Sequence, residues 1–310
     1  MTKNLARTCL AAVVAATPAL LLMGTAGQAQ AADSFPSQYA APYLQLGSDT
    51  VGDMAADQSA TGLNYYTLAF LTSSSGCTLQ WEDGGDPVGA YTSQINDLKS
   101  SGGSVIISFG GAGSTELAQS CTSVSDLTAA YQNVVSTYGV NRLDFDIEGG
   151  AMDDTASNQR RDQALAALQQ ADPSVQIDFT VPVAPSGLES DAQQMLSDAK
   201  SAGVNVNLVN IMTMDFGDGE NALNDAESGA NATASQLADI YGGSAADNWA
   251  RMGLTPIAGQ NDDDENFSQF DASTLESFAA SKGVQELSFW EVDEYDKAVG
   301  YAYSKIFNQI

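Results

Sequence analysis

Eight short apolar or alternating runs recur along the chain, and stretches with the period of amphipathic helices lie between them. The runs are Pro42 to Leu46, Tyr65 to Leu71, Ser104 to Phe109, Arg142 to Glu148, Gln176 to Val183, Asn207 to Met214, Gly253 to Ile257 and Glu286 to Val292. The helical stretches include Leu127 to Tyr138, Arg161 to Ala171, Asp191 to Ala202, Ala234 to Trp249 and Leu275 to Lys282. Strands that alternate with helices predict an α/β fold, here a (β/α)8 or TIM barrel.

No Pro-rich or Ser-rich linker divides this pattern, so we expect residues 32–310 to form a single domain. A doubly wound open sheet is the alternative, because periodicity does not give strand order. The Gly-rich dinucleotide fingerprint of that fold is missing after the first predicted strand. In a barrel, the functional side chains are expected at the carboxyl ends of the strands.

The first 31 residues have the features of a secretory signal peptide. Two basic residues precede an apolar run from Leu10 to Met23, and Ala29 to Ala31 fit a small-residue cleavage site. We therefore expect residues 1–31 to be removed and the protein to be secreted into the extracellular space. Cys77 and Cys121 would remain, and in an exported protein we expect them to form a disulfide.

Composition narrows the possible chemistry. The chain has 11 basic and 39 acidic residues, and loss of residues 1–31 would leave nine against 39, a net charge of −30. We interpret this acidity as a solubility or salt-tolerance feature rather than a means of binding a cationic substrate, and it makes nucleic acid and anionic membranes poor partners. The chain has no histidine, which excludes Ser-His-Asp and Cys-His mechanisms and histidine-rich zinc sites. Acid-base chemistry must come mainly from carboxylates.

One run, within residues 141–150, carries an unusual group of acids. Carboxylate and apolar residues alternate from Asp144 to Glu148, so a strand would place Asp144, Asp146 and Glu148 on one face. At a rise of about 3.3 Å per residue, neighbouring carboxylates would lie roughly 6 to 7 Å apart and titrate as a coupled set. Like charges this close destabilise a strand unless they share a proton or serve a ligand, so the stretch indicates a functional site.

Paired carboxylates in a cleft are typical of glycoside hydrolysis. The stretch also resembles the DxxDxDxE signature of glycoside hydrolase family 18, with Asn141 in place of the first acid. Ser108-Phe109-Gly110-Gly111 resembles the family's SxGG motif, and Met212-Thr213-Met214-Asp215 resembles its Met-x-Tyr-Asp motif. Trp290 matches the tryptophan that ends the eighth strand. The four motifs follow the family's order, and Met-Thr-Met-Asp is most similar to bacterial and archaeal chitinases.

The resemblance implies a retaining, substrate-assisted hydrolysis of β-1,4-N-acetylglucosaminide bonds in chitin or chitin oligomers. Glu148 would be the general acid and then the base, while the substrate's acetamido oxygen attacks the anomeric carbon to give an oxazolinium. Asp146 would hold the acetamido N–H, and Asp144 would share a proton with Asp146. Asp215 would orient the acetamido group or the sugar, and Trp290 would form an apolar floor.

Ser108 would donate a hydrogen bond to the pair of aspartates. The resemblance implies no cofactor and no metal ion, and we expect a monomer whose partner is chitin or an N-acetylglucosamine oligosaccharide.

Two positions depart from the family pattern. Asn141 lies farthest from the cleavage point, so we expect its effect to be structural. Met214 removes a tyrosine hydroxyl that the family uses on the acetamido group, and Gln260, Tyr43 or a water would have to replace it. Met212 and Met214 are expected either to fill the barrel or to contact the substrate.

Three other hypotheses fit the same residues. The protein would be an endo-β-N-acetylglucosaminidase acting on other glycans, a catalytically silent chitin-binding, lectin-like protein, or a hydrolase with Asp215 or Glu291 as a covalent nucleophile. The acidic run Asp262 to Glu265 lacks the spacing of a calcium loop, so we expect a solvated loop beside the cleft.

Overall fold

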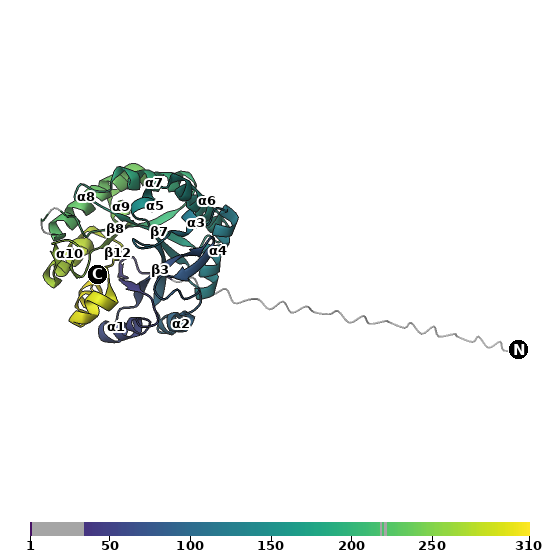
Figure 1. The fold of residues 1–310 in the computed structure, drawn as a ribbon, viewed down its shortest axis with the longest axis horizontal. Coiled ribbons are helices and arrows are strands. Elements are labelled where there is room, and N and C mark those ends of the chain that lie inside the picture. Colours follow the sequence, from purple (N-terminus) through teal and green to yellow (C-terminus); the bar gives the residue numbers. More distant parts are fainter. Residues whose placement is uncertain (2–33, 218, 220–221) are drawn as a thin grey trace. The chain divides into compact units, whose positions relative to one another are not determined.

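The computed structural model describes Met1 and residues 34–217, 219 and 222–310. Apart from Met1, the expected signal peptide lies outside the described residues. The part from residue 34 onwards belongs to one compact unit, in which helices surround a ring of strands (Figure 1). None of the helices among the described residues combines the length and apolar character needed to cross a membrane.

The strands and helices alternate along the chain as the sequence predicts. The strands are β1 (Tyr39–Ala40), β2 (Tyr43–Gln45), β3 (Tyr65–Ser75), β4 (Thr78–Trp81), β5 (Ser104–Gly110), β6 (Arg142–Asp146), β7 (Gln176–Pro182), β8 (Val206–Met212), β9 (Met252–Thr255), β10 (Gly259–Gln260), β11 (Asn266–Phe267) and β12 (Glu286–Leu287). The helices are α1 (Asp53–Thr61), α2 (Thr92–Ser100), α3 (Leu117–Ser120), α4 (Val124–Tyr138), α5 (Gly149–Asp153), α6 (Thr155–Ala171), α7 (Ser190–Ser201), α8 (Ala222–Tyr241), α9 (Ala245–Trp249), α10 (Gln269–Lys282), the π-helix η1 (Val292–Asp296), the short η2 (Lys297–Val299) and α11 (Ala302–Phe307).

The parallel strands close into a barrel. Their order is β1-β12-β9-β8-β7-β6-β5-β3-β2, and β1 and β2 belong to one extended segment. On one side of this segment, Tyr39 N–H donates to Gln285 C=O and Tyr43 N–H to Phe289 C=O, both at 3.0 Å. On its other side β2 pairs in parallel with β3, with Tyr43 opposite Thr67. The described residues therefore form the predicted (β/α)8 TIM barrel, and β4 adds an antiparallel hairpin to β3.

One predicted helix is wrong. The stretch from Ala234 to Trp249 is two helices, because Gly242 and Gly243 adopt left-handed φ angles of 73° and 87° between α8 and α9. Ser244 then starts α9 with a capping box to Asp247. Five helices were not predicted from the sequence, and most of them are too short to show a clear helical period: α1, α2, α3, α5 and α11.

The alternation of β6 separates two environments. Phe145 points outward, where its ring stacks on Phe109 of β5 at 5.1 Å and meets the ring edge of Tyr131 of α4 at 5.1 Å. The three aromatic side chains are fully buried between the barrel and its helices. The acids of β6 point the other way, into the barrel.

The opposite end of the barrel holds a buried ion pair. Arg142, the first residue of β6, donates from Nε to Asp178 Oδ2 at 2.5 Å, and both side chains are almost fully buried. Nearby, Tyr39 donates its hydroxyl to Glu286 Oε2 at 2.6 Å. Burial raises the pKa of Glu286 to about 8, although the Arg142 charge lowers it. The single cation therefore balances Asp178, while Glu286 is favoured in its neutral form.

A disulfide joins Cys77 and Cys121, as expected from the sequence. Cys77 lies in the turn between β3 and β4, and Cys121 ends α3. The bond closes a loop of 44 residues and ties the β3–β4 hairpin to the segment before α4.

Asp57 makes fold stability depend on pH. It is fully buried in α1, where Oδ2 accepts the Ser304 hydroxyl at 3.0 Å. Burial raises the pKa of Asp57 to about 6. A carboxyl whose pKa is higher in the folded state contributes stability below about pH 3.8, and this is lost as the pH rises through about 6.

We therefore expect Asp57→Asn to raise the free energy of unfolding at pH 7 by roughly 1 to 3 kcal/mol and to have little effect near pH 4. Denaturant unfolding at both pH values measures this difference. Asp97→Asn, an exposed change on α2, serves as the matched control. Equal destabilisation by Asp57→Asn at both pH values would contradict the assignment.

Candidate active site

A cavity of about 240 Å³ opens where the barrel strands end. Its lining residues are Tyr43, Phe70, Ala112, Asp146, Glu148, Thr180, Met212, Met214, Asp215, Thr255, Ile257, Asp262 and Trp290. Four of them are carboxylates and none is a lysine or arginine. Most of the residues that the sequence singles out therefore meet in one place, at the end of the barrel where function is expected.

Asp146 and Glu148 form a coupled pair at the end of β6. The strand ends at Asp146, two residues earlier than predicted, but Glu148 keeps an extended backbone (φ −133°, ψ 158°) and faces the same side. Burial raises the pKa of Asp146 well above its usual range, and the neighbouring Glu148 carboxyl raises it further. Burial also raises the pKa of Glu148, against a hydrogen bond from Asp146 that lowers it. The pair is thus arranged to hold one proton between two carboxyls.

Asp144 lies deeper in the barrel and takes three hydroxyl donors. Ser108 and Tyr43 donate to Oδ2 at 2.6 and 3.0 Å, and Thr180 donates to Oδ1 at 2.8 Å. Burial raises the pKa of Asp144 to about 7, and these hydrogen bonds lower it. Asp144 was expected to share a proton with Asp146, but in the structure the hydrogen bond of Asp146 goes to Glu148. Both oxygens of Asp144 are already engaged by hydroxyl groups.

The two glycines of the SFGG stretch allow close approach of neighbouring groups. A Cβ at Gly110 would lie 2.1 Å from the backbone oxygen of Asp146, and one at Gly111 would lie 2.7 Å from the ring of Phe70. Both glycines have left-handed φ angles, 106° and 85°. The Gly111 N–H donates to the Asp146 carbonyl at 3.1 Å. Any larger residue would displace the strand that carries Asp146.

An aromatic group forms one wall of the cavity. The Trp290 ring stacks on Phe70 with a 5.6 Å centroid separation and an interplanar angle of 9°. Tyr43 lies 6.0 Å from each of these two rings. Trp290 is partly exposed, so one side of the indole remains open to the cavity. A flat apolar surface of this kind suits the face of a sugar ring.

Asp215 is held by the acidic loop from Asp262 to Glu265. Its backbone is left-handed (φ 52°), and Oδ1 accepts the Asp262 N–H at 2.8 Å. The loop makes two further contacts, because Asp263 Oδ2 accepts the Gly217 N–H at 2.9 Å and the buried Glu265 accepts the Phe216 N–H. The loop lies beside the cavity and exposes Asp262 and Asp264, as expected, but it is not wholly solvated, because Glu265 is buried and Asp263 and Glu265 accept backbone N–H groups after β8. No group of three His, Cys, Asp or Glu in the described sequence is arranged to hold a metal ion.

Some predicted residues lie elsewhere. Gln260 lies outside the cavity lining, and its Nε2 donates to the carbonyls of Asp263 and Glu265 at 2.9 and 2.7 Å. Tyr43 lines the cavity, but its hydroxyl contacts Asp144 and Thr180. Neither side chain therefore directs a free hydrogen-bonding group to the position next to Met214.

Two more predicted positions have structural contacts. Glu291 is buried outside the cavity lining and accepts the Gln45 N–H at 2.9 Å; burial raises its pKa to about 7. Asn141 donates to the Ser174 carbonyl at 3.2 Å, at the beginning of β6. Both contacts fix strand ends to neighbouring segments.

Thr180 and Phe70 line the cavity but were not predicted as site residues, and Asp262 was expected only in a loop beside the cleft. Thr180 and Phe70 occur in predicted strands, so their position near strand ends was an available signal. Their proximity to Asp144 and Trp290 depends on strand register across the barrel, which periodicity does not give.

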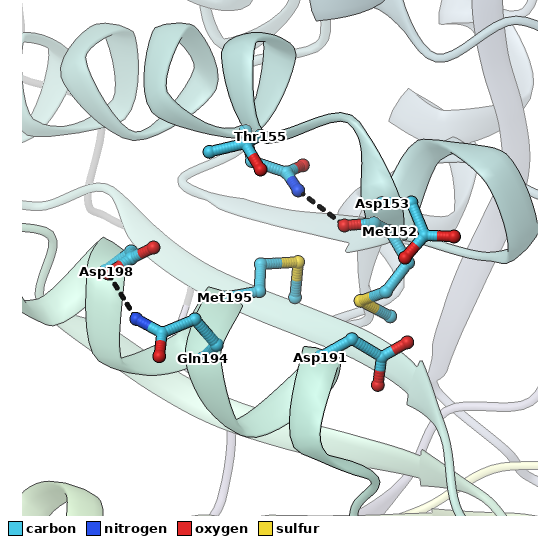
Figure 2. A pocket seen from close by; sticks show the side chains of 8 residues that line it. Met152, Asp153, Thr155, Asp191, Gln194, Met195 and Asp198 are labelled. Carbon is cyan, nitrogen blue, oxygen red and sulfur yellow. Dashed lines mark hydrogen bonds between the residues drawn. The ribbon is translucent and has the colours of Figure 1, made fainter.

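A second depression, of about 150 Å³, lies between α5, α6 and α7 (Figure 2). Met152 and Met195 lie in it with several acidic side chains around them, and Gln194 donates to Asp198 at 2.8 Å. It contains none of the residues predicted for the site. We therefore assign the candidate site to the barrel cavity.

Comparisons with known proteins concern the family and the fold. The family model for glycosyl hydrolases family 18 matches residues 41–256. The chain is 34% identical over 281 residues to a probable bifunctional chitinase/lysozyme of Escherichia coli (strain K12), and 34% identical over 275 residues to Endochitinase 11 of Metarhizium anisopliae. Both alignments cover 84% of this chain but only 31% and 53% of those two proteins.

Among solved structures, the chain is similar to the catalytic domain of a hyperthermophilic chitinase from Pyrococcus furiosus. The TM-score is 0.81 at 30% sequence identity, and the match covers 90% of this chain and 96% of that one. A putative chitinase A from Streptomyces coelicolor matches with a TM-score of 0.64 and 18% identity, over 88% of this chain and 98% of that one. The second likeness concerns the fold alone.

Proposed function

Because the chain belongs to glycoside hydrolase family 18, we propose that it is a chitinase that hydrolyses β-1,4-N-acetylglucosaminide bonds with retention of configuration. The single observation that carries the proposal is the coupled pair of Asp146 and Glu148 on the wall of the barrel cavity. A similar domain from Pyrococcus furiosus has been crystallised in complex with chito-oligosaccharides. The substrate proposed here is chitin or a chitin oligomer.

Glu148 is the general acid in this proposal. Its partly exposed carboxyl lines the cavity, and its raised pKa keeps a proton available above the usual range of carboxylic acids. After the glycosidic bond breaks, the resulting carboxylate accepts a proton from the incoming water. One group thus serves as acid in the first step and base in the second.

Asp146 acts on the substrate's acetamido group. Its Oδ1 is buried and has no hydrogen-bond partner among the described residues, so it can accept the acetamido N–H. That contact turns the acetamido oxygen towards the anomeric carbon, where it forms an oxazolinium without a protein nucleophile. A carboxyl next to the developing positive charge stabilises the intermediate.

The remaining lining residues position the sugar. The open face of Trp290 supports the ring, and Asp215 lies close enough to Glu148 for its charge to raise the pKa of that carboxyl. Met212 and Met214 add apolar contacts beside the acetamido methyl group. With methionine at position 214, the acetamido oxygen has no tyrosine donor, so Asp146 carries more of its orientation.

The experiment is to incubate the protein with N-acetylglucosamine oligomers and follow the products by proton NMR. We expect β-anomeric products in the first turnovers and inhibition by a thiazoline analogue of the oxazolinium. Initial α-anomers would contradict retention. Trapping a glycosyl ester on Asp215 or Glu291 would support a protein nucleophile instead.

A parallel assay on high-mannose glycopeptides tests the endo-β-N-acetylglucosaminidase hypothesis, and binding to insoluble chitin with no product at any pH would indicate a lectin-like protein. We also propose that residues 1–31 direct export and that the protein acts outside the cell as a monomer. The strongly acidic composition supports solubility there.

A further inference from the structure

A row of buried, hydrogen-bonded side chains on three neighbouring strands of the barrel, β9, β8 and β7, leads to Asp144. Thr255 of β9 donates to Asn210 Oδ1 at 2.8 Å, and Asn210 of β8 donates from Nδ2 to Thr180 Oγ1 at 3.1 Å. Thr180 of β7 then donates to Asp144 Oδ1 at 2.8 Å. We propose that Asn210 is a positioning residue, which holds the Thr180 hydroxyl on Asp144 so that the catalytic proton stays between Asp146 and Glu148.

The amide of Asn210 determines which group donates in each hydrogen bond of this row. The oxygen of Asn210 only accepts hydrogen bonds and its nitrogen only donates them. Thr180 therefore receives a hydrogen bond from Asn210 and keeps its own hydrogen for Asp144. A hydroxyl without such a neighbour would be free to turn its hydrogen towards Tyr43, which lies 2.8 Å away.

The barrel makes room for Asn210 and shields it. Gly253 lies opposite Asn210 in the sheet register, and a Cβ there would be 2.7 Å from Asn210 Oδ1. Asn210, Thr180 and Thr255 are at most 2% exposed, so their hydrogen bonds are largely shielded from bulk water although Thr180 and Thr255 border the cavity. In the protein without substrate, these hydrogen bonds are therefore held in place by protein groups.

The third hydroxyl completes the set of donors on Asp144. Ser108 and Tyr43 occupy Oδ2, and Thr180 occupies Oδ1. Three donors favour the carboxylate form of Asp144, and the charge of that carboxylate is one of the causes that raise the pKa of Asp146. Asp146 thus keeps its proton and directs it to Glu148.

Loss of the Thr180 hydroxyl would leave Asp144 Oδ1 buried without a donor. Asp144 would then bind a proton more readily, and its weaker negative charge would lower the pKa of Asp146. The other titratable groups that act on this acid set are Tyr43, Glu82, Asp178, Asp215 and Glu286, and Arg142 acts on Asp178 and Glu286. The variants below leave all of them in place.

This inference rests on the proposed function, and its test is Thr180→Val, which keeps the shape of the side chain and removes the hydroxyl. We expect kcat on chitin oligomers to fall about tenfold, the effect of one hydrogen bond to a charged group, with KM nearly unchanged. The alkaline limb of the pH profile should move to lower pH, because the pair of Asp146 and Glu148 loses its proton more easily. Thr180→Ser keeps the hydroxyl donor and should therefore have the wild-type kcat and the wild-type pH profile.

Two further variants separate positioning from packing. Gly253→Ala pushes Asn210 aside without touching the acids, and it should shift the pH profile in the same direction. Thr233→Val removes a buried hydroxyl on α8 that has no hydrogen-bond partner among the described residues, and it should change neither kcat nor the pH profile. If Thr180→Val folds and retains the wild-type pH profile, or if Thr233→Val shifts it equally, the positioning role is wrong. If Thr180→Val does not fold, Gly253→Ala decides by the same criterion.

A carboxyl ¹³C NMR titration of Asp144 gives a readout that needs no turnover. We expect the Asp144 pKa to rise in Thr180→Val and Gly253→Ala relative to wild type. An unchanged Asp144 titration in both variants would overturn the inference even if activity fell. An inactive wild-type protein with the expected titration shifts would instead contradict the proposed function and leave the positioning role supported.

Discussion

Glu148→Gln should lower the turnover of N-acetylglucosamine oligomers by about a thousandfold, within the range that one general acid-base group contributes. Glutamine has nearly the same shape but cannot deliver a proton to the leaving oxygen. Binding should persist, because Trp290 and Asp146 still line the cavity. Steady-state kinetics with oligomers and calorimetric titration of the variant with the same ligand measure the two effects.

Glu276→Gln on α10 is the matched control and should leave both quantities unchanged. The carboxyl of Glu276 lies outside the cavity lining, so the same chemical change is made away from the site. Wild-type turnover in Glu148→Gln would show that another group is the acid.

Asp146→Asn should reduce kcat by about a hundredfold, as expected for loss of a group that stabilises developing charge. The amide oxygen can still accept the acetamido N–H, so KM should change little. The amide cannot carry the negative charge that faces the oxazolinium, nor exchange a proton with Glu148. The pH profile should therefore change from that of two coupled carboxyls to that of one.

In the wild type, burial raises the pKa of both carboxyls; the Glu148 charge raises the pKa of Asp146 further, and the Asp215 charge raises the pKa of Glu148. Activity that needs one proton in the pair should persist above the usual carboxyl range and fall as the pH rises through the second deprotonation. Asp191→Asn, at the depression between α5 and α7, is the control for this variant. If the pH dependence of activity in Asp146→Asn still shows two ionising groups, Asp146 and Glu148 do not titrate as a pair.

The barrel could be predicted from the sequence because its strands and helices have distinct periods. The alternation from Asp144 to Glu148 also gave the facing of three acids, since a strand has only two sides. Gly110 and Gly111 could be recognised from their motif. The structure shows why glycine is needed there, because Asp146 and Phe70 leave no room for a Cβ.

The contacts between strands could not be predicted in this way. Thr180 and Asn210 look like ordinary strand residues, and they act together only because neighbouring strands have one register. Gln260 was a predicted partner of the acetamido group, but its amide nitrogen donates to two carbonyl groups of the adjacent loop. Local competition of this kind depends on loop geometry, which composition and spacing do not specify.

The segment that closes the barrel has a consequence for how the chain folds. The hydroxyl of Tyr39 bonds to Glu286 across a sequence separation of 247 residues, at the same seam where β1 pairs with β12. Contacts between residues this far apart in the sequence form slowly, because a large loop must be ordered before they form. We expect the seam to form late in folding, after the middle strands have paired, and an amide hydrogen-exchange experiment during refolding should find Tyr43 N–H protected after the N–H groups of β6 and β7.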